Sequence, residues 1–267
     1  MLHRPPELAG IFDEIPDDYE ARTDYPDGLW GVLVEQCGLG PGCRVLEIGP
    51  GSGQATIPML ERGAHVTAVE PGAGLARRLR ERTAGFALHV IVSRFETVDI
   101  SEAEYDLVAS ATAFHWVEPS VGLAKCARAL RDGGSLALWW TIWGDPERAD
   151  PFHDALRPIL EVKAPQLLEV ELTPQIYAQD LEARTGQIEA VGAFGPIHRH
   201  VFRWHGEHDP VAIRRLFATF APWLALPAPL RAELLNDIEQ LAAGPFGGLV
   251  RRPYQTVLYV AGRLPRP

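Results

Sequence analysis

The sequence is poor in lysine and cysteine, and both shortages count against particular kinds of chemistry. Lys125 and Lys163 are its two lysines, and both lie in stretches with helical spacing. Schiff-base catalysis needs a buried lysine, so this class of enzyme is disfavoured. The three cysteines, Cys37, Cys43 and Cys126, are odd in number and scattered. They form neither a disulfide framework nor a paired metal motif, and we expect reduced thiols that act as packing atoms.

The sequence also lacks a net positive charge and long apolar runs. The 267 residues carry a formal net charge of -10. This charge argues against broad contact with nucleic acid or an anionic membrane, because both need clustered positive charge. No apolar run approaches the roughly 18 residues of a membrane span, and residues 1–14 contain prolines and acids rather than a secretory apolar segment. We therefore expect a cytoplasmic protein that binds neither nucleic acid nor membrane.

The chain is organised around the segment from Arg44 to Gln54, RVLEIGPGSGQ. Its apolar positions predict a short, buried parallel strand. Glycines at 49, 51 and 53 follow, and residues 54–62 resume helical spacing. Glycines let the backbone turn sharply and lie close to a ligand. A strand, a glycine turn and a helix N-terminus therefore predict a site for a polar ligand at the carboxyl end of the strand.

The acid Glu47 in this strand separates two classes of nucleotide ligand. A dinucleotide fingerprint, G-x-G-x-x-G, holds a pyrophosphate, but Gln54 stands at its third glycine position here. A carboxylate at Glu47 repels an anion and attracts a cationic amino group. S-adenosylmethionine carries an ammonium and a sulfonium and no phosphate. The pattern apolar-apolar-Glu-apolar-Gly-x-Gly-x-Gly resembles the first motif of class I S-adenosylmethionine-dependent methyltransferases.

This resemblance implies that the segment holds the methionine portion of the cofactor. The implied residues are Glu47, Gly49, Pro50, Gly51, Gly53 and Gln54. A nicotinamide-dependent oxidoreductase on a Rossmann fold remains an alternative, since it uses a similar turn. A non-catalytic module that binds S-adenosylmethionine is a second alternative.

The next two predicted strands supply the residues expected around the adenosine. Residues 65–70 form a short strand that ends in Glu70, which is placed to accept two hydrogen bonds from a ribose diol and is followed by Pro71. A helix-capping acid is the simpler alternative for Glu70. Residues 87–92 form the third strand, and in the family the loop after it borders the adenine ring. We expect Arg94, Phe95 and Glu96 to frame that ring, although Phe95 also suits a packing role.

A second resemblance follows the fourth predicted strand, residues 105–110. The sequence ATAFHWVEP at 111–119 is typical of a small-molecule, type 11-like methyltransferase subgroup. The resemblance places Ala111 where the backbone approaches the reactive methyl group, and His115 near the transfer site. Histidine has an unperturbed pKa near neutrality, so His115 is a candidate general base for a substrate hydroxyl or amine. A structural histidine is the alternative.

The segment before the first strand resembles the lead-in of one methyltransferase subgroup, which closes over the methionine end of the cofactor. The residues concerned are Tyr19, Arg22 and Tyr25. Arg22 is suited to bind the cofactor carboxylate through two hydrogen bonds. If the resemblance does not extend to function, the tyrosines cover the sheet edge and Arg22 is a surface charge.

Five strands alternating with helices predict a parallel sheet with right-handed crossovers. We expect a turn at 131–134 before the fifth strand at 135–141, a sixth strand at 197–205 and a last strand at 254–261. The resemblance implies a doubly wound, Rossmann-like α/β fold with seven mostly parallel strands, an antiparallel last strand and a helical lid. Residues 1–142 and 251–267 would form the cofactor-binding core, and 143–250 the sixth strand and the lid.

Histidines near the sixth strand invite a metal site, which we do not expect. His198 and His200 share one strand face, and His205 and His208 follow, but no convincing set of acid or cysteine ligands completes them.

The overall prediction is transfer of a methyl group from S-adenosylmethionine to a small-molecule acceptor, by a monomer or homodimer. The lid aromatics Trp140, Trp143, Tyr177 and Trp204 are candidates for the acceptor pocket. The accepting atom, oxygen, nitrogen or carbon, stays open.

Overall fold

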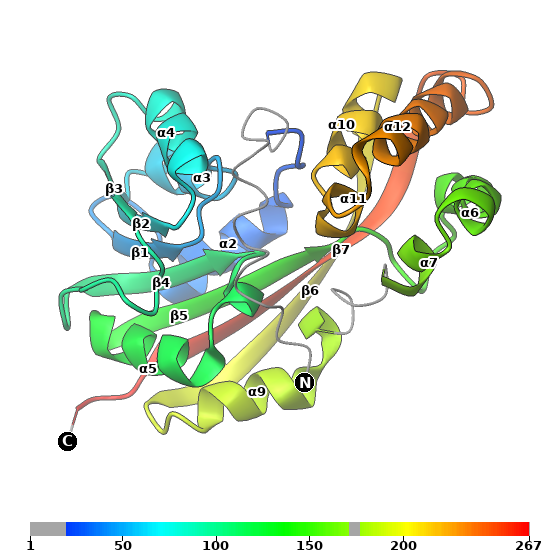
Figure 1. Ribbon diagram of the computed structural model, residues 1–267. Helices are drawn as coiled ribbons and strands as arrows, with labels where there is room; N and C mark the ends of the chain where they lie inside the picture. Colours follow the sequence, from blue (N-terminus) through cyan, green and yellow to red (C-terminus); the bar gives the residue numbers. More distant parts are fainter. Residues whose placement is uncertain (1–19, 171–176, 267) are drawn as a thin grey trace.

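The computed structural model describes residues 20–170 and 177–266. A seven-stranded sheet with the order β3-β2-β1-β4-β5-β7-β6 runs through its centre (Figure 1). The strands are β1 Arg44–Ile48, β2 His65–Glu70, β3 Leu88–Val92, β4 Tyr105–Ala111, β5 Leu130–Ile142, β6 Phe194–His208 and β7 Val250–Arg263. The helices beside the sheet are α2 Asp27–Cys37, α3 Thr56–Glu61, α4 Ala73–Arg82, α5 Pro119–Ala129 and α9 Leu181–Glu189.

Strand directions confirm the predicted fold class. The pairs β1–β2, β1–β4, β2–β3 and β4–β5 are parallel, whereas β7 lies antiparallel to both β5 and β6. Some strand boundaries differ from the predictions: β6 and β7 extend beyond the predicted 197–205 and 254–261. In place of a turn at 131–134, β5 already begins at Leu130, which pairs with Tyr105. The register shifts between Tyr105 and Leu107, so β5 takes up the glycine pair Gly133–Gly134 as an irregularity within the strand.

The side-chain alternation of the strands divides the core into two layers. Val45 and Trp139 point to the face covered by α2, α3 and α4. Leu46 and Trp140 point to the opposite face, where α5 and α9 pack. Each central strand is therefore buried on both sides, as its apolar sequence predicts. Because β1, β2, β4 and β5 run parallel, their carboxyl ends lie together at one end of the sheet, and the site is found there.

A second group of helices gathers at one end of β7 and has its own core. It contains α6 Pro151–Lys163, α7 Gln166–Val170, α10 Pro210–Ala218, α11 Ala221–Leu224 and α12 Ala228–Ala243 (upper right in Figure 1). Phe152, Phe217, Trp223 and Leu234 are fully or almost fully buried in this cluster. We call these helices the lid. By contrast, α9, which comes between β5 and β6 in the chain, packs against α5 beside the sheet. The proposed division of the chain at 142 and 250 stays a prediction.

The described helices include none that is long and apolar enough to cross a membrane.

Gly122 shows how tightly α5 fits against the segment after β4. A Cβ atom added there would lie 2.5 Å from Val117 Cγ1 and 2.9 Å from Phe114 Cζ. The helix thus fixes the short 3-10 turn at Phe114–Trp116.

Replacing Gly122 with alanine is expected to lower the free energy of unfolding by about 1–3 kcal/mol, because the added methyl group overpacks this contact. Gly186→Ala in α9 is the matched control, since nothing lies within 4 Å of a Cβ atom added there. That change should leave stability unchanged or raise it by about 0.5–1 kcal/mol through helix propensity. Urea denaturation of both variants measures the difference, and equal stabilities would contradict the packing argument.

Candidate active site

The loop between β1 and α3 is held in its turn by a close contact with the segment after β4. Gly49 has a φ of 67°, and its N–H donates to the Val69 carbonyl at 2.9 Å. A Cβ atom at Gly49 would lie 2.5 Å from the Cβ atom of Ala113. Glycine is therefore required here both by conformation and by space. Gly53, with a φ of 105°, is similarly crowded, since an added Cβ would meet Leu79 Cδ1 at 2.8 Å.

Glu70 lies beside this loop at the end of β2. Its two carboxylate oxygens accept hydrogen bonds from the backbone N–H groups of Gly51 and Gly72, each at 3.0 Å. Glu70 is 5% exposed. These two bonds fix the side chain against the loop. The acid thus braces the glycine turn in addition to its predicted ribose contact.

Glu47 is fully buried behind the loop and does not line the pocket described below. Its Oε2 accepts the Thr56 hydroxyl at 2.6 Å, whereas Oε1 has no hydrogen-bond partner. Burial raises the pKa of Glu47 to about 8; the hydrogen bond from Thr56 opposes this increase, and the charge on Glu70 adds to it. The carboxyl group is therefore neutral at pH 7 unless a cation or a further donor reaches it.

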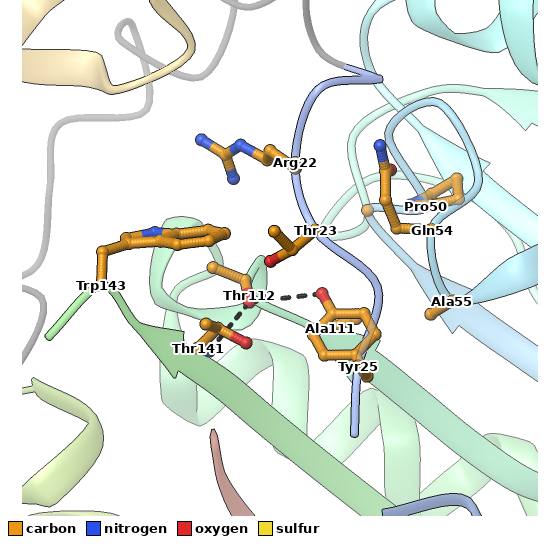
Figure 2. A pocket seen from close by; sticks show the side chains of 11 residues that line it. Arg22, Thr23, Tyr25, Pro50, Gln54, Ala55, Ala111, Thr112, Thr141 and Trp143 are labelled. Carbon is orange, nitrogen blue, oxygen red and sulfur yellow. Dashed lines mark hydrogen bonds between the residues drawn. The ribbon is translucent and has the colours of Figure 1, made fainter. Parts of the chain in front are cut away.

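A pocket opens between the glycine loop, the end of β4 and the end of β5 (Figure 2). It unites six predicted site residues from three distant parts of the chain: Arg22, Tyr25, Gly49, Pro50, Gln54 and Ala111. Trp143, predicted as a lid aromatic, forms one wall. The carboxyl ends of neighbouring strands meet here, which is the usual ligand position in open α/β sheets.

Four further lining residues were missed by the sequence analysis: Thr23, Ala55, Thr112 and Thr141. Thr112 has a φ of 52°, an uncommon conformation for a β-branched residue. Its N–H donates to Trp139 O at 2.7 Å, and its hydroxyl contacts the Tyr25 hydroxyl at 3.4 Å and the Thr141 N–H at 3.3 Å (Figure 2). The signal available was the position of Thr112 directly after β4, within the run of small residues.

The lead-in segment, residues 20–25, crosses the pocket and is bonded to α4 on one side and to the end of α10 on the other. Glu20 forms an ion pair with Arg78 of α4. Arg22 donates from Nε to Thr219 Oγ1 at 3.3 Å and from Nη2 to Thr219 O at 2.9 Å. Thr219 caps the C-terminus of α10, so the segment connects the cofactor side of the sheet with the lid. Tyr19, predicted in the same group, lies outside the described residues.

The residues predicted around the adenine ring do not line this pocket. Phe95 is 3% exposed and packs in the core, and its carbonyl accepts from Lys125 Nζ at 2.8 Å. Arg94 and Glu96 form an ion pair, with 3.5 Å between Arg94 Nη2 and Glu96 Oε1. Pro71 is exposed directly after Glu70. Their contact with adenine stays a prediction, and the burial of Phe95 assigns its ring a packing role in addition.

His115 also lies outside the residues that line the pocket. Its Nδ1 accepts the indole N–H of Trp140 at 3.1 Å, and its ring contacts Trp116 and Tyr177. An indole nitrogen is a donor only. The neutral form of His115 therefore carries its proton on Nε2, which makes Nε2 a donor in this arrangement. The general-base role stays a prediction.

Two of the four histidines near β6 have hydrogen-bond partners. His200 contacts Gln36 Oε1 at 3.2 Å, and His208 contacts the Tyr254 hydroxyl at 2.9 Å. Burial lowers the pKa of His208 to about 4, helped by the charge on Arg252. Within residues 20–170 and 177–266, no three histidine, cysteine or acidic side chains are grouped so as to hold a metal ion.

Comparison with known proteins identifies the family. Residues 46–138 match the family model described as a methyltransferase domain. An uncharacterized methyltransferase of Geobacillus kaustophilus is 33% identical over 55% of this chain and 77% of its own length. One of Mycobacterium tuberculosis is 26% identical over 89% of this chain and 87% of its own length.

Among solved structures, a Haemonchus contortus phosphoethanolamine N-methyltransferase in complex with S-adenosylhomocysteine superimposes with a TM-score of 0.56. It is 15% identical and matches 97% of this chain, which spans 58% of that protein. The likeness shows a shared fold. Together with the family match and the sheet order, these relatives show that the chain belongs to the class I S-adenosylmethionine-dependent methyltransferases and is an enzyme that uses S-adenosylmethionine as its methyl donor.

Proposed function

We propose that this methyltransferase acts on a small-molecule acceptor. The observation that carries the proposal is the pocket at the ends of β4 and β5, which lies between the glycine loop, the lead-in segment and Trp143. Arg22 and Thr23 line one side of this pocket and the indole of Trp143 lines another, and an enclosed site of this kind suits a compact molecule. The net charge of -10 also disfavours a polyanionic acceptor such as nucleic acid.

Within this proposal, two observations fit the cofactor to the site. The Gly49 turn leaves no space for a side chain and brings its backbone close to the pocket, as the methionine portion requires. Glu70 is fixed beside Gly51 at the carboxyl end of β2, the position to which the ribose diol is assigned. Arg22 and Tyr25 are assigned to the methionine end, the segment 94–96 to the adenine, and Ala111 to the region of the transferred methyl group.

Glu47 fits the ammonium group of the cofactor for a different reason. Its Oε1 is buried without a hydrogen-bond partner, which is costly for a polar atom. A cation that reaches this oxygen, directly or through a bridging water, compensates the cost and favours the ionised acid. Glu47 is then neutral in the empty enzyme at pH 7 and charged in the complex, so binding is coupled to loss of its proton.

Binding of S-adenosylhomocysteine is therefore expected to release up to about one proton between pH 6 and 7.5, because Glu47 must ionise below its raised pKa. Affinity should increase with pH across this range. Calorimetric titration in buffers of different ionisation enthalpy measures the proton count. Glu47→Gln should bind more weakly and release no proton, while Glu35→Gln, an exposed acid of α2, should behave as the wild type. Equal proton release by Glu47→Gln and wild type would remove Glu47 from this role.

The chemistry needs alignment and exclusion of water more than it needs reactive side chains. S-adenosylmethionine supplies a methyl group on a positively charged sulfur, which a nucleophile attacks in line. The protein contributes by holding both partners and by desolvating them. Trp143, Thr112 and Thr141 are the residues placed to orient an acceptor. His115 does not line the pocket, and its neutral form carries the proton on Nε2; to accept a proton at Nε2 it must first change tautomer, which costs the bond from Trp140.

Incubation with methyl-labelled S-adenosylmethionine and a panel of small hydroxyl, amine and carbon acids should transfer label to at least one acceptor class. On that acceptor, His115→Ala should lower kcat less than tenfold, because Nε2 carries the proton and the ring does not line the pocket; a loss of about 100-fold or more would instead assign the histidine the base role. Trp116→Phe, which keeps the neighbouring aromatic ring, is the control.

Two results would count against the proposal. Transfer of label only to nucleic acid or protein, with no small acceptor modified, would replace the acceptor class. Thermal stabilisation by a nicotinamide dinucleotide and none by S-adenosylhomocysteine would contradict the cofactor assignment itself.

A further inference from the structure

The end of helix α10 in the lid makes a two-point contact with the arginine of the lead-in segment. Thr219 is fully buried at this end. Its carbonyl accepts from Arg22 Nη2 at 2.9 Å, and its Oγ1 accepts from Arg22 Nε at 3.3 Å. The hydroxyl proton is directed elsewhere, to Leu216 O at 2.7 Å. Thr219 thus presents two acceptors to one edge of the guanidinium.

Two hydrogen bonds to the same edge determine where the rest of the guanidinium points. A guanidinium is planar and carries its donors in a fixed fork. Bonds from Nε and Nη2 to a single residue therefore fix the plane, and with it the direction of the Nη1 side. The negative end of the α10 dipole adds attraction for the cation, because the last carbonyls of a helix concentrate partial negative charge.

The same arginine lines the pocket, although its partner belongs to the lid. Figure 2 shows its guanidinium on the Trp143 side of the lead-in segment, away from Gln54. Residue 22 and residue 219 are 197 positions apart, so this contact forms only when the lid is packed in place. The orientation of Arg22 at the pocket therefore depends on α10.

We propose that Thr219 is a positioning residue that orients Arg22 for the carboxylate of the cofactor's methionine portion. This inference rests on the proposed assignment of Arg22 to that carboxylate. It makes the lid part of the cofactor site as well as a cover for the acceptor. Affinity for a ligand with the amino-acid portion then depends on the Thr219 hydroxyl, whereas affinity for the nucleoside alone does not.

Two related ligands separate these contributions. S-adenosylhomocysteine has the carboxylate, and 5′-methylthioadenosine keeps the nucleoside and thioether but lacks the amino-acid group. Thr219→Val is expected to weaken binding of S-adenosylhomocysteine about tenfold, the scale of a lost charge-assisted contact, and to change binding of methylthioadenosine less than about twofold. Thr219→Ser, which keeps the hydroxyl, should restore the wild-type ratio of the two dissociation constants.

Thr83→Val is the matched control, since Thr83 is also buried at a helix C-terminus and donates to Leu79 O at 2.7 Å. It makes no contact with Arg22 and should leave the ratio unchanged. If Thr219→Val does not fold, Thr219→Ala removes the same hydroxyl with less crowding. An unchanged ratio in a folded Thr219 variant, or equal losses for both ligands, overturns the inference. Failure of the wild type to bind S-adenosylhomocysteine would instead contradict the cofactor assignment.

Discussion

The structure of the site depends on the contact between Gly49 and Ala113. The loop after β1 and the segment after β4 approach until an added Cβ atom on the glycine would overlap that of Ala113, at 2.5 Å. On its other side, the Gly49 N–H is bonded to Val69 of β2. The glycine is thus fixed between β2 and β4, the strands on either side of β1, and the pocket opens between this loop and the ends of β4 and β5. A larger residue at either position would separate the loop from Ala111 and widen the pocket.

Two buried acids behind this loop are satisfied to different extents. Glu70 accepts two backbone N–H groups, so its orientation is fixed without a ligand. Glu47 accepts one hydroxyl and keeps an oxygen without a partner. Burial raises the pKa of Glu47 to about 8, against the opposing effect of the Thr56 hydroxyl. Glu70 thus serves the architecture of the turn, and Glu47 is the acid that we propose responds to charge brought by a ligand.

The parts of the site predictable from sequence are those encoded by local backbone requirements. The roles of Gly49 and Glu47 were predictable because a strand, a turn and the start of a helix follow one another within eleven residues. The alternation of predicted strands and helices likewise predicted the parallel sheet. Thr141 and Thr219 could not be found this way, because they reach the pocket region only through packing of β5 and of the lid. The early start of β5 has the same cause, since pairing of Leu130 with Tyr105 outweighs the local turn preference of the glycine pair.

The distribution of charge explains how such a site favours transfer over mere binding. Among the described lining residues, Arg22 is the charged one, and the remainder are hydroxyl, amide, aromatic or small. Methyl transfer discharges a positive sulfur, so a carboxylate beside it would stabilise the starting state more than the transition state. Here the acids stand behind the glycine loop, where Glu47 is fully buried and Glu70 is bonded to Gly51. In the proposed arrangement they hold the ends of the cofactor, and none of the described residues that line the pocket offers the sulfonium an anionic partner.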